Sequence, residues 1–122
     1  MIEEAFRAAA AALASPKMGT EAVAPLLYDL VMLHRPRRIL EVGGGLSSLY
    51  LLKGLADCDA AIAAERGAPG ETGTGDDSGL LNQAYFQAPL APARLHMIDN
   101  LVHADTTAGK VIQAAKKLGL DA

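Results

Sequence analysis

The sequence lacks tryptophan, has a single cysteine, and carries few aromatic residues, which make up 4% of its 122 positions. Because Cys58 has no second cysteine to pair with, no disulfide can form within the chain, which suits the reducing cytoplasm. No apolar run approaches the roughly 20 residues that a membrane-spanning helix requires. Glu3 and Glu4 stand where a secretory signal would place basic residues before an apolar core. We therefore expect a cytoplasmic protein with no membrane partner.

Dense positive charge is also missing. The formal net charge is −3, and the one close group of basic residues, Arg35, Arg37 and Arg38, is short. Since nucleic-acid binding depends on clustered lysine and arginine, we expect no nucleic-acid partner. The chain does contain 51% hydrophobic residues, enough for one small domain with a buried core.

Residues 1–35 carry two helical patterns. Apolar side chains recur at helical spacing from residue 2 to residue 14. Thr20 is a suitable N-cap for a second helix, in which Pro25 is expected to kink or delay the first turns. This helix should end just before Pro36, because the residue ahead of a proline disfavours helical geometry. We treat residues 1–35 as an N-terminal helical segment.

Residues 36–122 begin with a strand, a glycine turn and a helix. Residues 37–42 predict a buried strand that runs into three consecutive glycines, and a helical pattern starts at Ser47. This order is typical of the opening of a parallel α/β unit. Residues 94–99 predict a second strand, followed by a helix that ends at Gly119.

The stretch between these two strands has a different character. Glycines and acidic residues crowd residues 67–79, too densely for a packed element. Long loops of this kind are unusual in a compact domain unless they are functional or disordered. We expect a flexible insertion at about residues 59–93.

The glycine turn is the main chemical feature of the sequence. Gly43, Gly44 and Gly45 let a ligand approach the backbone, and the following helix N-terminus offers N–H groups and a positive dipole end. Glu41 at the head of the turn suits a pyrophosphate poorly, whereas its carboxylate can accept hydrogen bonds from an ammonium group. The alternative is a tight turn without a ligand, although three glycines lose considerable backbone entropy on folding.

The pattern Glu41-x-Gly43-x-Gly45 after an apolar strand resembles motif I of class I S-adenosylmethionine-dependent methyltransferases. The helix and strand before it, and residues 97–120 after it, are similar to the N-terminal half of small-molecule O-methyltransferases. The resemblance covers about half to two-thirds of the chain but only the first half of the family's fold. Ser47 stands at the position of the usual third glycine, as in some branches of the family.

The resemblance implies a Rossmann-like three-layer sandwich of class α/β, incomplete here, with N-terminal helices and the first βαβα units. It implies S-adenosylmethionine as cofactor and methyl transfer to a small-molecule acceptor, for which a hydroxyl is suggested. The residues that would line the cofactor are Glu41, Gly43, Gly44, Gly45 and Ser47. Asp99, at the end of the second strand, would bind the ribose hydroxyls.

Glu65 is a rival for the ribose-binding role. The distance from Glu41 to Asp99 is far longer than the roughly 20 residues between a Rossmann turn and its acid. Residues 60–65 offer an alternative second strand that ends at Glu65. Alanine, however, is a poor strand former, and a glycine-rich loop follows this segment instead of a helix. We therefore prefer Asp99.

Two histidines and two acids near the second strand raise the question of a metal site: His96, Asp99, His103 and Asp105. His96 and Asp99 would point to opposite faces of the strand, and Asp105 is well placed to cap the following helix. We predict no metal site. His103 is the candidate catalytic residue, as a general base for a substrate hydroxyl.

Two strands and four helices do not complete an α/β sheet, since parallel sheets contain more strands and are covered on both faces. An unpaired strand edge also invites another chain. We expect a truncated chain, a homodimer, or a subunit whose sheet a partner completes. A non-catalytic module and a small NAD-binding oxidoreductase are the alternative functions.

Overall fold

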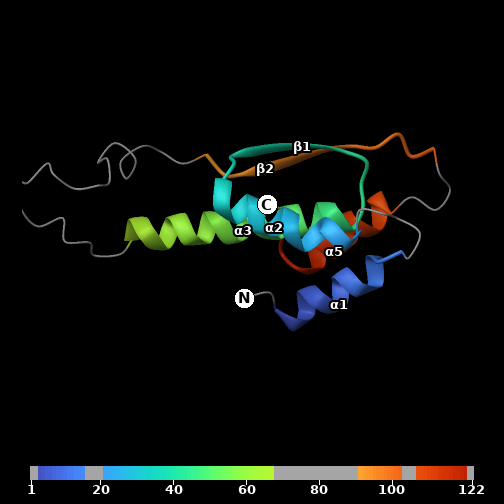
Figure 1. Cartoon of the computed structure of the whole chain (residues 1–122), viewed down its shortest axis with the longest axis horizontal. Helices are drawn as coiled ribbons and strands as arrows, with labels where there is room; N and C mark the ends of the chain where they lie inside the picture. The colour runs from blue at the N-terminus through green and yellow to red at the C-terminus, as the bar shows by residue number, and fades with distance from the viewer. Residues whose placement is uncertain (1–2, 16–20, 68–90, 103–106, 121–122) are drawn as a thin grey trace, which may run out of the picture.

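The computed structural model of the chain describes residues 3–15, 21–67, 91–102 and 107–120 (Figure 1). Its elements are, in chain order, α1 (Glu4–Leu13), the 3-10 helix η1 (Glu21–Val23), α2 (Ala24–His34), β1 (Arg38–Val42), α3 (Leu46–Gly67), β2 (Arg94–Ile98) and α5 (Ala108–Lys117). Among the described residues, no helix combines the length and the apolar character that a membrane span requires.

The two strands form a parallel sheet in which Arg38 lies opposite Arg94 and Val42 opposite Ile98. Parallel neighbours need a crossover connection, and α3 is part of it. The protein is therefore a mixed α/β fold, as predicted from the order of strand, glycine turn and helix. In Figure 1 the described helices all lie on one side of the strands. A second helical layer, which a three-layer sandwich would have, is not present among the described residues.

The other face of the sheet is open. Leu40, Val42 and Ile98 are 66%, 83% and 57% exposed, while the alternate side chains are half-buried towards the helices. The expectation that residues 37–42 form a fully buried strand is therefore wrong for one of the two faces. The reason is physical, because an apolar run cannot reveal whether one or both faces of its strand are covered.

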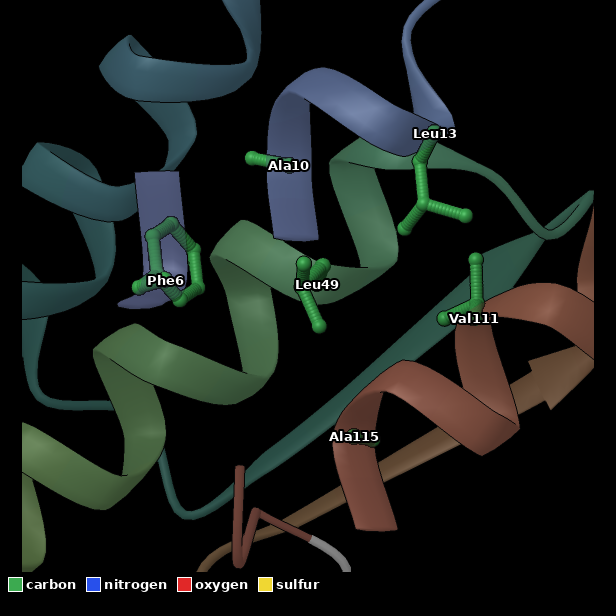
Figure 2. Close-up of a cluster of buried hydrophobic side chains, with 6 residues drawn as sticks. All are labelled: Phe6, Ala10, Leu13, Leu49, Val111 and Ala115. Atoms are coloured by element: carbon green, nitrogen blue, oxygen red, sulfur yellow. The ribbon is translucent and has the colours of Figure 1, made fainter. Parts of the chain in front are cut away.

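One hydrophobic cluster joins α1, α3 and α5 (Figure 2). Its buried members are Phe6, Ala10, Leu13, Leu49, Val111 and Ala115. The rings of Phe6 and Tyr50 meet edge to face, with centroids 5.0 Å apart. Side chains from residues 1–35 and from residues 36–122 thus share one core.

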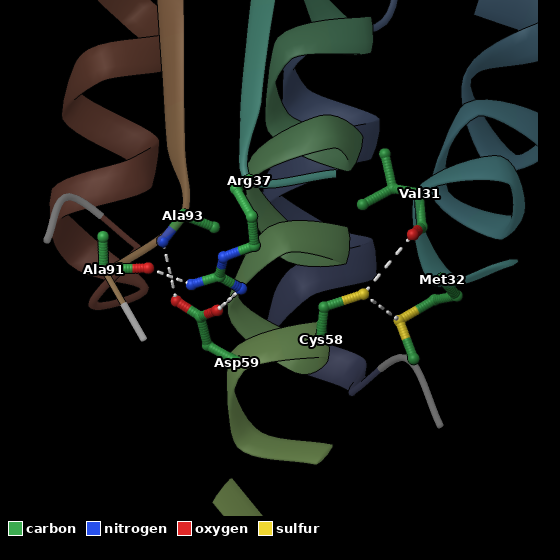
Figure 3. Close-up of polar contacts among 7 residues, drawn as sticks. All are labelled: Val31, Met32, Arg37, Cys58, Asp59, Ala91 and Ala93. Carbon is green, nitrogen blue, oxygen red and sulfur yellow. Dashed lines mark hydrogen bonds and ion pairs between the residues drawn. The ribbon is translucent and has the colours of Figure 1, made fainter. Parts of the chain in front are cut away.

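A second cluster packs α2 against α3 and the start of β2. Its buried members are Val31, Leu51, Leu55, Cys58 and Ala93. A Cβ atom at Gly54 would lie 2.9 Å from Val31, so the glycine permits the close approach of the two helices. The Cys58 thiol donates to the Val31 carbonyl at 3.4 Å, and burial raises its pKa (Figure 3). Cys58 is a packing residue.

Asp59 anchors the start of the sheet (Figure 3). Its carboxylate pairs with Arg37 at 2.5 Å and accepts the backbone N–H of Ala93 at 3.0 Å. Arg37 also donates to the carbonyl of Ala91. These contacts join α3 to the residues just before both strands, and they help to set the observed register.

The helix boundaries confirm two local predictions and correct two others. Pro25 lies in the first turn of α2, where no N–H is needed, so the helix starts late, at Ala24. Gly119 has φ +67° just after α5, the left-handed conformation expected of a glycine that ends a helix. Residues 59–67, however, continue α3 and are not part of an insertion. The alternative strand at residues 60–65 is also wrong, because these residues lie in α3. The physical reason is that alanine favours helix more strongly than any other residue. Residues 68–90 lie outside the described residues.

Candidate functional site

The glycine turn lies where the carboxyl ends of β1 and β2 meet the N-terminus of α3. The N–H of Gly43 donates to the carbonyl of Ile98 at 2.8 Å, which extends the strand pairing by one step. Gly43 has φ +90°, a conformation that side-chain-bearing residues rarely adopt, and a Cβ there would meet no atom within 4 Å. The chain therefore reverses sharply at Gly43 next to open space.

Glu41 lies half-buried on β1 beneath this turn. One carboxylate oxygen, Oε1, accepts a hydrogen bond of 2.7 Å from the hydroxyl of Ser47 in the first turn of α3. The other oxygen, Oε2, is buried and has no hydrogen-bond partner among the residues that the structure describes. A buried carboxylate oxygen without a donor is costly. Glu41 thus keeps one carboxylate oxygen for which the described residues supply no donor.

Asp99 follows β2 and ties the two strand ends together. Its Oδ2 atom accepts the N–H of Gly44 at 2.9 Å, and its Oδ1 atom accepts the N–H of Leu101 at 2.8 Å. The second contact holds Leu101 in the left-handed region, with φ +53°. Asp99 is therefore adjacent to the glycine turn, as the sequence predicts, and its carboxylate already orders the backbone on both sides.

Gly44 serves packing as well as access. A Cβ atom at this position would lie 2.5 Å from the sulfur of Met97 and 3.0 Å from the Cβ of Ala108. The carbonyl of Gly44 accepts a 2.7 Å hydrogen bond from the hydroxyl of Thr107 before α5. At Gly45, by contrast, a Cβ would make only an ordinary contact of 3.5 Å with Thr107.

Ser48 closes the N-terminus of α3. Its hydroxyl accepts the N–H of Gly45 at 3.1 Å, while its own N–H donates to the Gly45 carbonyl at 3.1 Å. This reciprocal pattern resembles a capping box. The sequence analysis missed Ser48 and Thr107. Ser48 could have been found from its place three residues after the glycine that precedes the helix, whereas nothing in the sequence pairs Thr107 with Gly44.

The structure brings Glu41, the three glycines, Ser47 and Asp99 into one site, although 58 positions separate Glu41 from Asp99 in the numbering of the chain. Glu65 does not join them. It lies near the opposite end of α3 and pairs with Arg35 through two hydrogen bonds of 2.7 and 2.8 Å. This pairing lowers the pKa of the Glu65 carboxyl. Glu65 therefore does not lie at the end of a strand beside the glycine turn, as the rival assignment requires.

His103 and Asp105 lie outside the described residues, so the catalytic role of His103 stays a prediction. Within the part of the chain that the structure describes, no three histidine, cysteine or acidic side chains converge on a point where a metal ion could bind.

A cavity of about 410 Å³ lies under the sheet, between α3, β2 and α5. Its lining is mostly aliphatic, with side chains such as Leu52, Leu95 and Val111. None of the predicted cofactor residues lines it. The cavity follows the free edge of β2, where the described residues supply no further strand.

Comparisons of the chain with protein-family models, with curated proteins and with solved structures found no match.

Proposed function

We propose that the glycine turn binds the methionine portion of S-adenosylmethionine, and that the chain is the cofactor-binding part of a methyltransferase. The observation that carries the proposal is the buried Oε2 atom of Glu41, which has no donor among the described residues. An ammonium group is the kind of ligand that such an oxygen lacks. A pyrophosphate would be repelled by the same carboxylate.

Glu41 is prepared for this role by its neighbour. The Ser47 hydroxyl holds Oε1 and so directs the carboxylate from the strand towards the start of α3. A hydrogen bond to a charged group contributes more than a neutral one, about 1.5–3 kcal/mol. Binding of a cation at Glu41 would therefore offset the cost of burying its second oxygen.

Asp99 is the second proposed anchor. Its carboxylate lies beside the glycine turn, where its oxygens accept the N–H groups of Gly44 and Leu101. Ribose hydroxyls of the cofactor would donate to the same carboxylate, since a carboxylate oxygen can accept more than one hydrogen bond. Glu41 and Asp99 would then hold the two ends of the nucleoside-like cofactor on either side of the glycine turn.

The proposal includes a Rossmann-like arrangement, because ligands of open α/β sheets bind at the carboxyl ends of the strands. The bound cofactor would supply an electrophilic methyl group on a positively charged sulfur. The chain's own residues would bind the ammonium and ribose groups and orient them. The acceptor is proposed to be a hydroxyl on a small molecule, with the substrate pocket completed by further chain or by a partner subunit.

Isothermal titration calorimetry of the full chain tests the proposal with three ligands. We expect S-adenosylmethionine and its demethylated product to bind at one site per chain, and NAD not to bind. Binding of NAD in place of both would overturn the proposal in favour of a nucleotide-dependent oxidoreductase. Binding of none of the three would favour a module without a cofactor.

A further inference from the structure

The outer side of α2 carries a row of exposed apolar side chains, defined here as the α2 seam. Its members are Val23, which ends η1 and directly precedes α2, and Leu26, Leu30 and Leu33 of α2; they are 43%, 54%, 40% and 75% exposed. Val31, on another face of the helix, is buried against α3, where its carbonyl accepts a hydrogen bond from Cys58 (Figure 3). Large exposed apolar patches on a small domain mark interaction surfaces.

The spacing of the α2 seam is that of a coiled-coil interface. Its members are separated by three, four and three residues, which corresponds to positions a, d, a and d of a heptad. Leucine occupies both d positions, and valine occupies the first a position. The a position within α2, Leu30, is leucine as well. Such a row can pack against a second copy of itself.

The polar residues beside the seam complement each other in such a pair. Asp29 and His34 are exposed and lie on opposite sides of the seam, at positions g and e. In a parallel pair, a g residue faces the e residue that lies five positions later on the other helix. Asp29 of one copy would thus face His34 of the second copy, and the two-fold axis repeats the contact. An imidazole N–H can donate to the carboxylate in each pair.

The open face of the sheet is a poorer surface for self-association. Arg38 and Arg94 lie side by side on that face, at the opposite end from Val42 and Ile98. A two-fold axis along the strands would bring the arginines of both copies together. An axis across the strands would press them onto apolar side chains, and burial of an unpaired charge is costly. The α2 seam carries no such conflict.

We propose that the protein forms a two-fold dimer through parallel packing of the α2 seams of two copies. This dimer is independent of cofactor binding, because the seam contains none of the residues of the glycine turn. One short helix per copy covers less than the roughly 800 Å² per partner of a standard stable interface. The dimer is therefore weak and reversible.

Sedimentation equilibrium over a range of concentrations tests the proposal with the full chain. We expect the wild type to dimerise, and Leu26→Glu and Leu33→Glu to weaken the dimer more than about tenfold, since each removes buried leucine area from both copies. Both side chains are more than half exposed, so the monomer should keep its fold, which circular dichroism verifies. Leu40→Glu, on the open sheet face, is the matched control and should leave the dimer unchanged. A monomeric wild type, or a dimer lost only in the control, would overturn the proposal.

Exchanging the charges at Asp29 and His34 tests whether these two residues pair across the dimer. His34→Glu should weaken the dimer because it sets two carboxylates against each other, and Asp29→Lys added to it should restore association. If the double variant dimerises no more strongly than His34→Glu alone, the parallel pairing is wrong.

Leu30→Cys gives a second test, because identical a positions face each other across the axis within disulfide range. Mild oxidation should yield a covalent dimer, and its absence would contradict the parallel arrangement.

Discussion

The Oδ2 atom of Asp99 accepts a 2.9 Å hydrogen bond from the backbone N–H of Gly44. Through this contact the residue after β2 fixes the turn after β1, and the two strand ends form one rigid platform. The other oxygen of Asp99 orders the backbone at Leu101. Asp99 therefore has a structural role that is independent of any ligand.

The first prediction concerns this structural role. Asp99→Ala removes both acceptors and leaves two backbone N–H groups to find other partners, so the free energy of unfolding should fall by about 1–3 kcal/mol. Asp99→Asn retains one carbonyl acceptor and should lose less. Urea denaturation of the two variants measures the difference. Equal stability of Asp99→Ala and wild type would show that the bridge contributes nothing to the fold.

A pair of glycine substitutions separates packing from access in the turn. Gly44→Ala should reduce the free energy of unfolding by about 1–3 kcal/mol, because the new methyl group would overlap Met97 and the Cβ of Ala108. Gly45→Ala should be close to neutral, since its methyl group would make only an ordinary contact with Thr107. Thermal or urea unfolding checks both variants. The account of the turn is wrong if Gly45→Ala is the more damaging change.

The sequence was informative where local geometry determines structure. Gly43 needs a positive φ and Gly119 ends a helix, and both were placed correctly because few other residues suit such positions. Residues 60–65 were assigned to a flexible insertion or to a short strand and are helical instead, because a short alanine-rich run has no clear period. The open face beyond Leu40 and Val42 was not predictable, since burial depends on elements far away in the sequence.

The site itself was predicted in part. The resemblance to methyltransferase motif I led us to expect Glu41, Ser47 and Asp99 in one site, and the structure brings them together, while their binding of a cofactor stays a prediction. The roles of Ser48 and Thr107 are tertiary, apart from the helix-capping signal at Ser48. They depend on how closely α5 approaches the turn, and no spacing rule along the chain encodes that distance.

A third prediction concerns alkaline pH. Burial, together with a 2.8 Å hydrogen bond to Asp57, raises the pKa of Tyr28 from 10.0 to about 12. Because the folded protein holds this proton more tightly than the unfolded chain, the stabilisation is complete below pH 10 and is lost as the pH rises towards 12.

Tyrosinate absorbance and urea denaturation across this range provide the measurement. Tyr28→Phe should remove a tyrosine titration near pH 12 and reduce the decline in stability between neutral and alkaline pH. Tyr50→Phe is the control, because Tyr50 has no corresponding hydrogen bond to a carboxylate among the described contacts. An unchanged pH dependence in Tyr28→Phe would contradict the assignment.

The most direct test of the proposed cofactor site is the affinity for S-adenosylmethionine of Glu41→Gln relative to wild type, measured by calorimetry. The amide keeps the size of the side chain and an acceptor for Ser47 but removes the charge that would bind an ammonium group. We expect binding to weaken by at least about tenfold, equivalent to about 1.4 kcal/mol, while Glu4→Gln on the exposed side of α1 leaves it unchanged. Equal affinity of Glu41→Gln and wild type would contradict the account.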